Sequence, residues 1–573
     1  MSTASLLTVV TFVGFTALVA VVSWWKTRNE DLSHSTGYFL GGRSLGWGVI
    51  AGSLILTNIS TEQLVGMNGG AYANGVSLMA WEVVAVVAMV AMAWFFLPRY
   101  LSRGISTIPQ FIGLRYGGGV RVLLSAATLF AIITGALPFV LYSGAVFFET
   151  MFGVSEKTGL GLIPTLYLVC GAIGLLGGAY SIFGGLKAVA VSDTINGIGL
   201  IVGGMIVPVL GLYALGDGSI TAGLETVFTV EPERLSPMAD RSNPAAVPFS
   251  TLFTGMLLIN VSYWCMSQFI VQRTFGAKSM KDGQKGILLA AGLKLVGLLI
   301  LVLPGLIAYH LLGPGIEPID TSYPQLVKRV MPWYLEGFFA AVVLGAILSS
   351  FNSALHSAST LFGLDVYKNA IKKDATDGEA VTASKIVGLA LMLGSIAVAP
   401  LIAVFGDGLF AAMKIIGSAI ATPTGALTFA GIFLPFISGR AAVSVLPLGI
   451  ALQSFYVLYI NQQYGIVRLL PWMGEDSPSI HWLHFTFANF VLLLAIMTLL
   501  SKTVMPPRRP MPKAIAPTDA SAAEAARTGD AVEAEMDGAA IDLTWSRAAI
   551  PAGIALIALV VALYATLAWV GSS

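Results

Sequence analysis

Long apolar stretches recur along the whole chain, and short polar segments that carry most of the charged residues separate them. A helix needs about 20 mostly apolar residues to cross the hydrocarbon core of a bilayer. Fourteen stretches suit this purpose, at residues 4–25, 46–72, 77–98, 122–150, 161–184, 188–214, 248–272, 286–311, 335–364, 384–404, 409–436, 441–461, 480–501 and 548–570. The pattern predicts an all-α polytopic membrane protein with about 14 transmembrane helices, because outer-membrane barrels show roughly ten-residue alternating segments instead.

The composition agrees with this prediction. Of the 573 residues, 56% are hydrophobic and 11% are charged, whereas soluble domains carry about 25% charged residues. The first apolar stretch is followed by Lys26 and Arg28 without a small-residue cleavage site, so we interpret it as a retained helix and not as a signal peptide. The net charge of +1 gives no reason to expect a nucleic-acid partner, and the sequence shows no sign of an obligatory protein partner besides the lipid bilayer.

The distribution of Lys and Arg predicts the orientation. Most of them lie in the loops that follow odd-numbered spans, whereas the loops after even-numbered spans hold only Lys157, Arg234, Arg241, Lys328, Arg329 and Arg468. Basic loops stay in the cytoplasm, so both termini are expected to be extracytoplasmic in a multi-pass protein of the cell (inner) membrane. Residues 505–546 are rich in Ala, Pro, Asp and Glu without a hydrophobic period, which predicts a disordered cytoplasmic linker.

The second span contains a polar stretch, LTNISTEQLVGMNGGAYANG at residues 56–75. Asn58, Glu62 and Gln63 fall inside it. Lipid satisfies neither exposed backbone groups nor charges, so such a stretch marks a cavity or a site. In secondary transporters, discontinuous helices near the bilayer midplane bind ions and substrates. The alternative interpretation is a small polar packing interface between helices.

A second stretch, LINVSYWCMSQF at residues 258–269, is similar to the first. Asn58-Ile59-Ser60 in the first corresponds to Asn260-Val261-Ser262 in the second. Each stretch begins a block of five spans, namely spans 2–6 and spans 7–11. Because five is an odd number, two such blocks have opposite topology, as in transporters built from inverted repeats.

The ninth span is interrupted by hydroxyl side chains in GAILSSFNSALHSAST at residues 345–360. Serines in membrane helices often bond to their own backbone, which is the alternative for any one of them. The adjacent pair Ser349 and Ser350 is more specific, because a hard cation prefers several oxygen ligands. Together with backbone carbonyls of an interrupted helix, these hydroxyls indicate a cation site.

Other kinds of chemistry have little support in the sequence. It contains no Walker-type phosphate loop and no His-Glu-x-x-His motif, and its five histidines are scattered. No nucleophile is accompanied by a base, so the chain is not expected to be an enzyme. A cation channel is the remaining alternative to a coupled secondary transporter, but a channel has no use for buried Glu, Gln, Asn and Lys residues suited to an organic solute.

Several motifs resemble the sodium/solute symporter family, in particular its sugar branch, which includes the bacterial sodium/galactose symporter and the sodium/glucose cotransporters. The motifs are NISTEQLVGM (58–67), YSIFGGLKAVAVSD (180–193), YWCMSQFIVQRTFGAKS (263–279), QKGILLAAGLKL (284–295) and AILSSFNSALHSASTLFGLDVYK (346–368). The resemblance implies sodium-coupled uptake of a glucose- or galactose-like hexose by alternating access. It also implies a LeuT-type fold with a leading segment (1–45), a first repeat (46–247), an inverted second repeat (248–440) and trailing helices (441–573).

The resemblance also implies the site residues. The sodium ligands would be the carbonyl groups of Leu56, Ile59 and Ala346 and the hydroxyl groups of Ser349 and Ser350, with Asp193 on the inward path of the ion. The residues expected to bind the sugar are Asn58, Gln63, Trp81, Glu82, Asn260, Tyr263 and Lys294. Tyr263 would also form the inner gate, and Met67 the outer gate. Whether one or two sodium ions move per cycle is left open.

The chain departs from the family at three positions near the expected sugar site. The serine that follows the glutamate in relatives is replaced by Ala85, a neighbouring tyrosine is Trp81, and a sugar-contacting glutamine is not evident in FAAMKIIGSAIATP (410–423). Another polyol, a sugar acid, a sulfonated sugar or a carboxylate therefore remains an alternative solute. Lys414 lies near the missing glutamine, and it either extends to the outer interface or points into the solute cavity.

Overall fold

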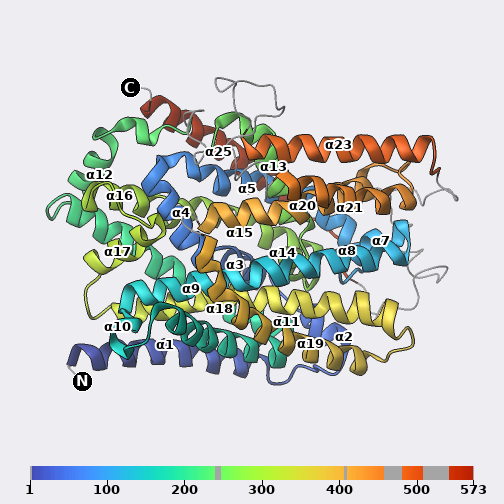
Figure 1. Cartoon of the computed structure of the whole chain (residues 1–573), viewed down its shortest axis with the longest axis horizontal. Helices are drawn as coiled ribbons and strands as arrows, with labels where there is room; N and C mark the ends of the chain where they lie inside the picture. The colour runs from blue at the N-terminus through green and yellow to red at the C-terminus, as the bar shows by residue number, and fades with distance from the viewer. Residues whose placement is uncertain (1–2, 239–246, 406–408, 457–480, 507–540, 572–573) are drawn as a thin grey trace.

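The computed structural model describes residues 3–238, 247–405, 409–456, 481–506 and 541–571. Within these ranges the chain is almost entirely helical, and the only extended pairings are two isolated bridges, Leu45 with Ala277 and Ser279 with Asp542. Many of the helices run roughly along the long axis of the molecule, and α1 begins and α25 ends at the same end of it (Figure 1). Nine helical stretches of the described residues are long and apolar enough to cross a membrane.

Each of the fourteen predicted spans contains one helix or a group of consecutive helices. In chain order they are α1 (Thr3–Thr27), α3 (Trp47–Asn58) with α4 (Thr61–Asn74), α5 (Ala80–Ala91) with α6 (Leu97–Leu101), α8 (Gly118–Ala131) with α9 (Leu137–Phe152), the two halves of α11 (Leu162–Leu215), α13 (Gly255–Val261) with α14 (Gln268–Phe275), α15 (Met280–Leu301) with α16 (Leu303–Leu312), α18 (Glu336–Thr360), α19 (Asp377–Val398), α20 (Leu409–Phe433), α21 (Gly439–Phe455), α23 (Trp482–Lys502) and α25 (Ala549–Val570). The prediction of an all-α polytopic protein is confirmed.

Shorter helices lie between the spans. They are α2 (Ser35–Leu40), α7 (Ile108–Tyr116), α10 (Val154–Thr158), α12 (Ile220–Thr229) and α17 (Ser322–Val330). Within α11, Gly185 separates the two predicted spans with a φ of +64°, a conformation that residues with a Cβ rarely adopt. A Cβ atom there would also lie 3.0 Å from the carbonyl oxygen of Tyr38, so this close approach requires glycine.

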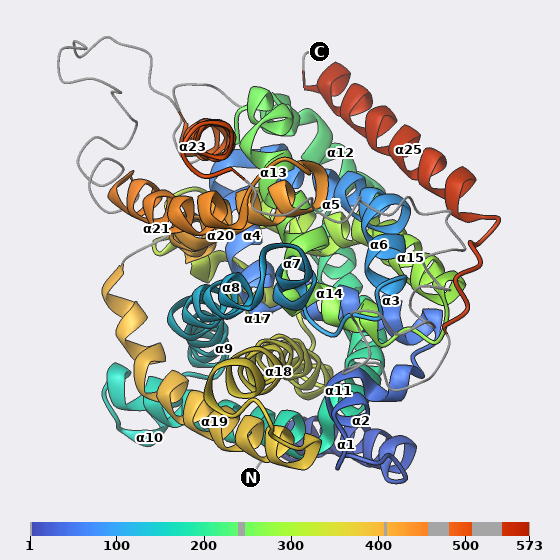
Figure 2. The ribbon, with the colours of Figure 1, turned by 90° about the vertical axis from the view of Figure 1, so that its right-hand side faces the viewer.

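The helices differ in how much lipid-facing surface they expose. Viewed along the helices, α18 lies inside the bundle, and α1, α19 and α25 lie at its edge (Figure 2). The apolar window of α18 is 94% buried, whereas those of α1 and α25 are only 11% buried. Because α18 packs against α1, α3, α9 and α11, its serines are surrounded by protein.

Most of the predicted linker 505–546 lies outside the described residues. Its C-terminal end is attached to the bundle, because Met280 N donates to Asp542 O (2.8 Å) and Ser546 N donates to the side chain of Gln284 (2.8 Å). The indole N–H of Trp94 then donates to Ala549 O (3.0 Å) at the start of α25. Residues 541–546 are therefore part of the folded protein, and the predicted linker was too long at this end.

Candidate functional site

The second span is broken between α3 and α4. α3 ends at Asn58, Ser60 is extended (φ −106°, ψ −177°), and α4 begins at Thr61. Ser60 N donates to Asn58 O (3.0 Å) and Gln63 N donates to Ser60 O (3.1 Å). Neither N–H therefore reaches the carbonyl group four residues earlier, and the carbonyls of Leu56 and Ile59 lose their helical partners.

The predicted serine pair on α18 lies against this break. Ser350 Oγ donates to Thr57 O at 3.0 Å, which joins α18 to the last turn of α3. Ser349 Oγ is buried and has no hydrogen-bond partner among the described residues. Ala346 lies one turn earlier on α18 and is completely buried. The five predicted sodium ligands therefore lie on two helix segments in contact with each other.

The chemistry of these groups fits sodium. They are all oxygens, and each is either a backbone carbonyl or a hydroxyl, as a hard monovalent cation requires. The hydroxyl oxygen of Ser349 would be a ligand of a bound ion, and the hydroxyl of Ser350 keeps a lone pair for the ion while it donates to Thr57 O. A buried polar atom without a partner is costly unless something binds it.

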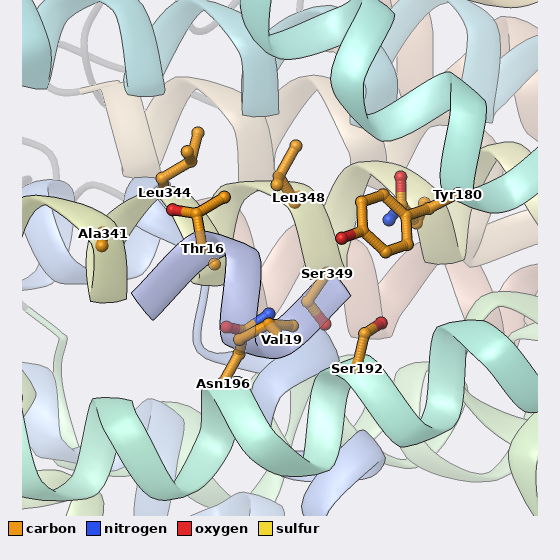
Figure 3. Close-up of a pocket in the computed structure, with 11 residues that line it drawn as sticks. Thr16, Val19, Tyr180, Ser192, Asn196, Ala341, Leu344, Leu348 and Ser349 are labelled. Atoms are coloured by element: carbon orange, nitrogen blue, oxygen red, sulfur yellow. The ribbon is translucent and has the colours of Figure 1, made fainter. Parts of the chain in front are cut away.

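A small cavity of about 20 Å³ adjoins Ser349 between α1, α11 and α18. The hydroxyl groups of Ser349 and Ser192 and the amide of Asn196 point into it (Figure 3). Asn352, one turn after Ser349, also lines it, and its Oδ1 atom has no partner among the described residues. The volume suits one or two water-sized species.

Asp193, the predicted residue of the ion path, lies on α11 and is completely buried. Its Oδ2 accepts a hydrogen bond from Ser53 of α3 at 2.6 Å, and its Oδ1 has no partner among the described residues. Arg273 of α14 donates through Nε to the same Ser53 (3.3 Å) and also contacts Ser353 of α18. This buried network connects α3, α11, α14 and α18, and sequence analysis did not predict the part played by Arg273.

A larger cavity of about 270 Å³ lies beside the helix break and is lined by Asn58, Glu62 and Gln63 of the broken segment. All seven residues expected to bind the sugar line it, namely Asn58, Gln63, Trp81, Glu82, Asn260, Tyr263 and Lys294. They come from α3, α4, α5, α13, α15 and the π-helical turn Ser262–Met266 between α13 and α14. The structure therefore brings together the whole predicted binding set, although its parts are more than 200 residues apart in sequence.

Lys294 is the centre of the polar wall of this cavity. Its ammonium group forms an ion pair with Glu82 and donates to Asn58 Oδ1, and all three side chains are buried. Asn58 Nδ2 lies 3.4 Å from the hydroxyl of Tyr263. A buried pair of charges is tolerated when hydrogen bonds satisfy it, and these contacts hold the ammonium group of Lys294 inside the bundle.

Three other predicted residues, Asn260, Gln63 and Trp81, differ in their contacts with the rest of the protein. Asn260 Nδ2 donates to Met256 O in its own helix (3.0 Å). Gln63 Oε1 is buried and has no partner among the described residues, so it is available to a solute. Trp81 stacks on Trp482 of α23, with ring centroids 6.2 Å apart, and a helix outside the two predicted repeats thereby supports one wall.

Met67 stands apart from this set. It is completely buried on α4, and it is not among the described residues that line the cavity. Its role as an outer gate concerns another conformation of the protein and stays a prediction.

Two charged residues of the cavity were absent from the predicted binding set. Glu62, in the first turn of α4, lines the cavity, and its Oε2 atom has no hydrogen-bond partner among the described residues. Lys414 of α20 lines it as well, with its Nζ 5.6 Å from the ring centroid of Trp81 and 5.4 Å from that of Tyr263. Of the two orientations considered for Lys414, the structure has the one that points into the cavity.

The second interrupted span breaks later than the sequence echo suggests. The chain continues as helix through Asn260 and Ser262, and the extended residue is Ser267 (φ −82°, ψ 122°), between the π-helical turn Ser262–Met266 and α14. Ser267 occupies the N-cap position of α14, although its side chain makes no capping hydrogen bond. The break therefore lies within the similar stretch 258–269 but not at its Asn-x-Ser triplet.

Comparison with known proteins agrees with this arrangement. The sequence model of the sodium:solute symporter family matches residues 38–449. An uncharacterized symporter of Escherichia coli (strain K12), YidK, is 43% identical over 491 residues, which cover 86% of this chain and 83% of YidK. The sodium/glucose cotransporter of Vibrio parahaemolyticus is 31% identical over 426 residues, which cover 70% of this chain and 76% of the cotransporter.

Solved structures show the same fold at lower sequence identity. A Na+-coupled sialic acid symporter, in a substrate-bound outward-open state, superposes with a TM-score of 0.69 at 18% identity and covers 88% of this chain and 99% of its own. Mhp1, a nucleobase-cation-symport-1 family transporter, superposes with a TM-score of 0.50 at 16% identity, covering 81% of this chain and 94% of its own. These similarities concern the fold alone.

The helical architecture, the broken helices and the polar cavity beside them define a sodium-coupled secondary transporter of LeuT type, and not an enzyme. The family match covers more than half of the chain, and the identity to YidK extends over most of it. The chain belongs to the sodium:solute symporter family. It is an integral membrane protein that uses sodium ions to move a small solute.

Proposed function

We propose that this symporter imports a hexose-like sugar by alternating access. The observation that carries the proposal is the cavity in which Gln63, Asn260 and the Lys294–Glu82–Asn58 network surround a space flanked by Trp81 and Tyr263. Sugar hydroxyls both donate and accept hydrogen bonds, so amides, a carboxylate and an ammonium group bind them well. Aromatic rings suit the apolar faces of a pyranose ring.

The proposed ion site comprises the carbonyls of Leu56, Ile59 and Ala346 and the hydroxyls of Ser349 and Ser350. One sodium ion that enters with the membrane potential supplies about 2.3 kcal/mol per 100 mV, and a tenfold sodium gradient adds about 1.4 kcal/mol. The sum of about 3.7 kcal/mol supports a solute gradient of roughly 500-fold. One ion at this site is therefore sufficient for useful accumulation.

The proposed orientation places both termini outside the cytoplasm, in the cell (inner) membrane. It is supported by the concentration of Lys and Arg in the loops after odd-numbered spans. In this orientation, Arg273 and Asp193 lie on the cytoplasmic side of the proposed ion site, where sodium leaves.

Uptake into proteoliposomes tests the solute class. Hexoses, polyols, sugar acids, sulfonated sugars and small carboxylates are offered with and without an inward sodium gradient. We expect accumulation of at least one hexose that collapses when the gradient is removed. Polyols deserve inclusion because the human sodium/myo-inositol cotransporter is 30% identical over 453 residues, which cover 72% of this chain and 61% of that protein. Accumulation of carboxylates without any sugar or polyol would contradict the proposal, and ion flux without any solute would favour a channel.

Ser350→Ala tests the ion site. The change removes a proposed sodium ligand and the bond to Thr57, so sodium-driven uptake is expected to be lost at physiological sodium while the protein still reaches the membrane. The matched control is Ser395→Ala on α19, whose hydroxyl bonds only to Leu391 O of its own helix in the structure (2.6 Å). If Ser350→Ala leaves the sodium concentration for half-maximal uptake unchanged, this serine is not a ligand.

A further inference from the structure

Glu62 and Lys414 form a second carboxylate–ammonium set in the solute cavity, separate from the Lys294–Glu82–Asn58 network. Glu62 lies on α4, directly after the helix break, and Lys414 lies on α20. Both side chains line the same cavity. Neither residue is in the predicted binding set, although Lys414 lies near the place where relatives have a sugar-contacting glutamine, so the role of the two charges in this chain needs its own explanation.

The Lys294–Glu82–Asn58 network already uses the first ammonium group. Lys294 contacts Glu82 and Asn58, and its Nζ lies 5.5 Å from the ring centroid of Trp264. Its exposed fraction is 1%. This network therefore fixes one wall of the cavity with its charges balanced.

The second set is arranged differently. Lys414 Nζ lies against the rings of Trp81 and Tyr263, which stabilise a cation through their π faces. Glu62 lines the same cavity, and a carboxylate and an ammonium group that share a cavity of low dielectric constant attract each other. Glu62 Oε2 has no hydrogen-bond partner among the described residues, so it offers an acceptor to whatever enters.

The charges of the cavity balance. Among its described lining residues are two carboxylates, Glu62 and Glu82, and two ammonium groups, Lys294 and Lys414. A net charge at the centre of a membrane protein is costly, so a cavity of zero net charge receives a neutral solute without a new unpaired charge. A uronate or a hexosamine would leave one charge uncompensated.

We propose that Glu62 and Lys414 act as a pair that selects an electrically neutral, polyhydroxylated solute over its acidic and amino derivatives. A carboxylate only accepts hydrogen bonds and an ammonium group only donates them. Hydroxyl groups satisfy both at once, whereas a solute carboxylate repels Glu62 and a solute ammonium repels Lys414. The inference rests on the proposed sugar symport and concerns the net charge of the solute that the cavity binds.

The test uses the full-length protein in proteoliposomes and three variants, Glu62→Gln, Lys414→Gln and the double variant. The probes are galactose, galacturonate and galactosamine, with the matching glucose series, at a pH where the amine is protonated. For each protein, uptake efficiency is measured for every probe under the same sodium gradient. Lys278→Gln is the matched control, because Lys278 is an exposed residue paired with Asp282 outside the cavity.

Wild type is expected to favour the neutral hexose over both derivatives. Glu62→Gln leaves one positive charge in excess, so the ratio of uronate to hexose uptake is expected to rise at least about tenfold, equivalent to about 1.4 kcal/mol. Lys414→Gln leaves one negative charge in excess and raises the ratio of hexosamine to hexose by a similar factor. The double variant restores charge balance and the preference for the neutral hexose, and Lys278→Gln behaves as wild type.

Three results would overturn the inference. The first is a wild type that prefers a uronate to the hexose, which would show that Lys414 binds an acid. The second is single variants whose ratios of uronate to hexose and of hexosamine to hexose uptake are unchanged, which would show that the pair does not determine selectivity. A double variant that keeps the altered ratio of either single variant excludes action as a pair. If a single variant fails to reach the membrane, the double variant and the other single variant still provide the comparison. Failure of the sugar proposal is distinct, because wild type would then accumulate none of the neutral probes.

Discussion

Two buried ion pairs of this symporter have opposite surroundings. Asp365, after the end of α18, accepts hydrogen bonds from Arg121 Nε (2.6 Å), Thr107 Oγ1 (2.9 Å) and Ser125 Oγ (3.0 Å). Arg121 also donates to the carbonyl group of Leu364 at 3.2 Å. Every oxygen of this carboxylate is therefore satisfied by the protein.

The pair of Lys294 and Glu82 instead lines a cavity, and the side chains of Gln63 and Glu62 next to it keep oxygen atoms without partners among the described residues. Burial alone does not distinguish the two pairs, since all four charged groups are about one-tenth exposed or less. The distinguishing property is whether neighbouring polar atoms are satisfied. A satisfied network holds helices together, and an unsatisfied one is completed by a ligand.

Arg121→Ala is the change with the largest expected effect on stability. It leaves Asp365 as a buried charge with only two hydroxyl partners, and removal of one member of a buried pair typically costs about 3–5 kcal/mol. We expect a strongly lowered unfolding temperature in detergent. Arg99→Ala is expected to change it less, because Arg99 is partly exposed and its side chain donates to Phe95 O four residues earlier on the surface. An unaltered unfolding temperature in Arg121→Ala would show that the Arg121–Asp365 pair has no structural role, and the contrast with the Lys294–Glu82 pair would then fail.

Lys294→Gln is expected to affect solute affinity most. Glutamine keeps a donor near Asn58 and Glu82 but removes the charge, and loss of a charged hydrogen-bond partner costs about 2–3 kcal/mol. The solute concentration for half-maximal uptake should rise roughly 30- to 150-fold, with a smaller change in unfolding temperature than in Arg121→Ala. Equal destabilisation by the two variants would show that the Lys294–Glu82 pair is structural as well.

Gln63→Ala has the smallest predicted effect on uptake of the three variants. It separates solute binding from stability most clearly. Its Oε1 atom has no hydrogen-bond partner among the described residues, so the removal of this side chain should change the free energy of unfolding by less than about 0.5 kcal/mol. Half-maximal uptake should require about tenfold more solute, because one hydrogen bond of about 1.4 kcal/mol is lost. Concentration-dependent uptake and thermal unfolding of the same preparation separate the two quantities.

Sequence analysis predicted the helices and the first broken helix well, because apolar length and a local polar stretch report them directly. The residues of the broken helix itself, Asn58 to Gln63, are where the interruption was expected. The second interruption lies at Ser267, inside the stretch 258–269 that is similar to the first, but its exact residue was not predictable because similarity between two short segments does not fix the backbone of either.

The networks were not predictable in the same way. Arg121 and Asp365 are 244 residues apart, and Arg273 and Ser53 are 220 residues apart, so no local pattern connects them. Glu62 was noticed as an acid in the polar stretch, and its position in the first turn after the break was the available signal. The orientation of Lys414 needed the structure, because a lysine six residues into a helix either reaches the interface or faces inward.

The broken helix has a consequence for the direction of transport. The proposed ion ligands, the carbonyls of Leu56 and Ile59, and the proposed solute ligands, the side chains of Asn58 and Gln63, belong to one segment of eight residues. If both proposals hold, one segment binds the ion and the solute. By linkage, the factor by which sodium tightens solute binding equals the factor by which the solute tightens sodium binding. At equilibrium the coupling is symmetric, so either gradient can drive the movement of the other solute. The same segment would run in reverse and expel sodium whenever the outward solute gradient exceeds the inward sodium gradient.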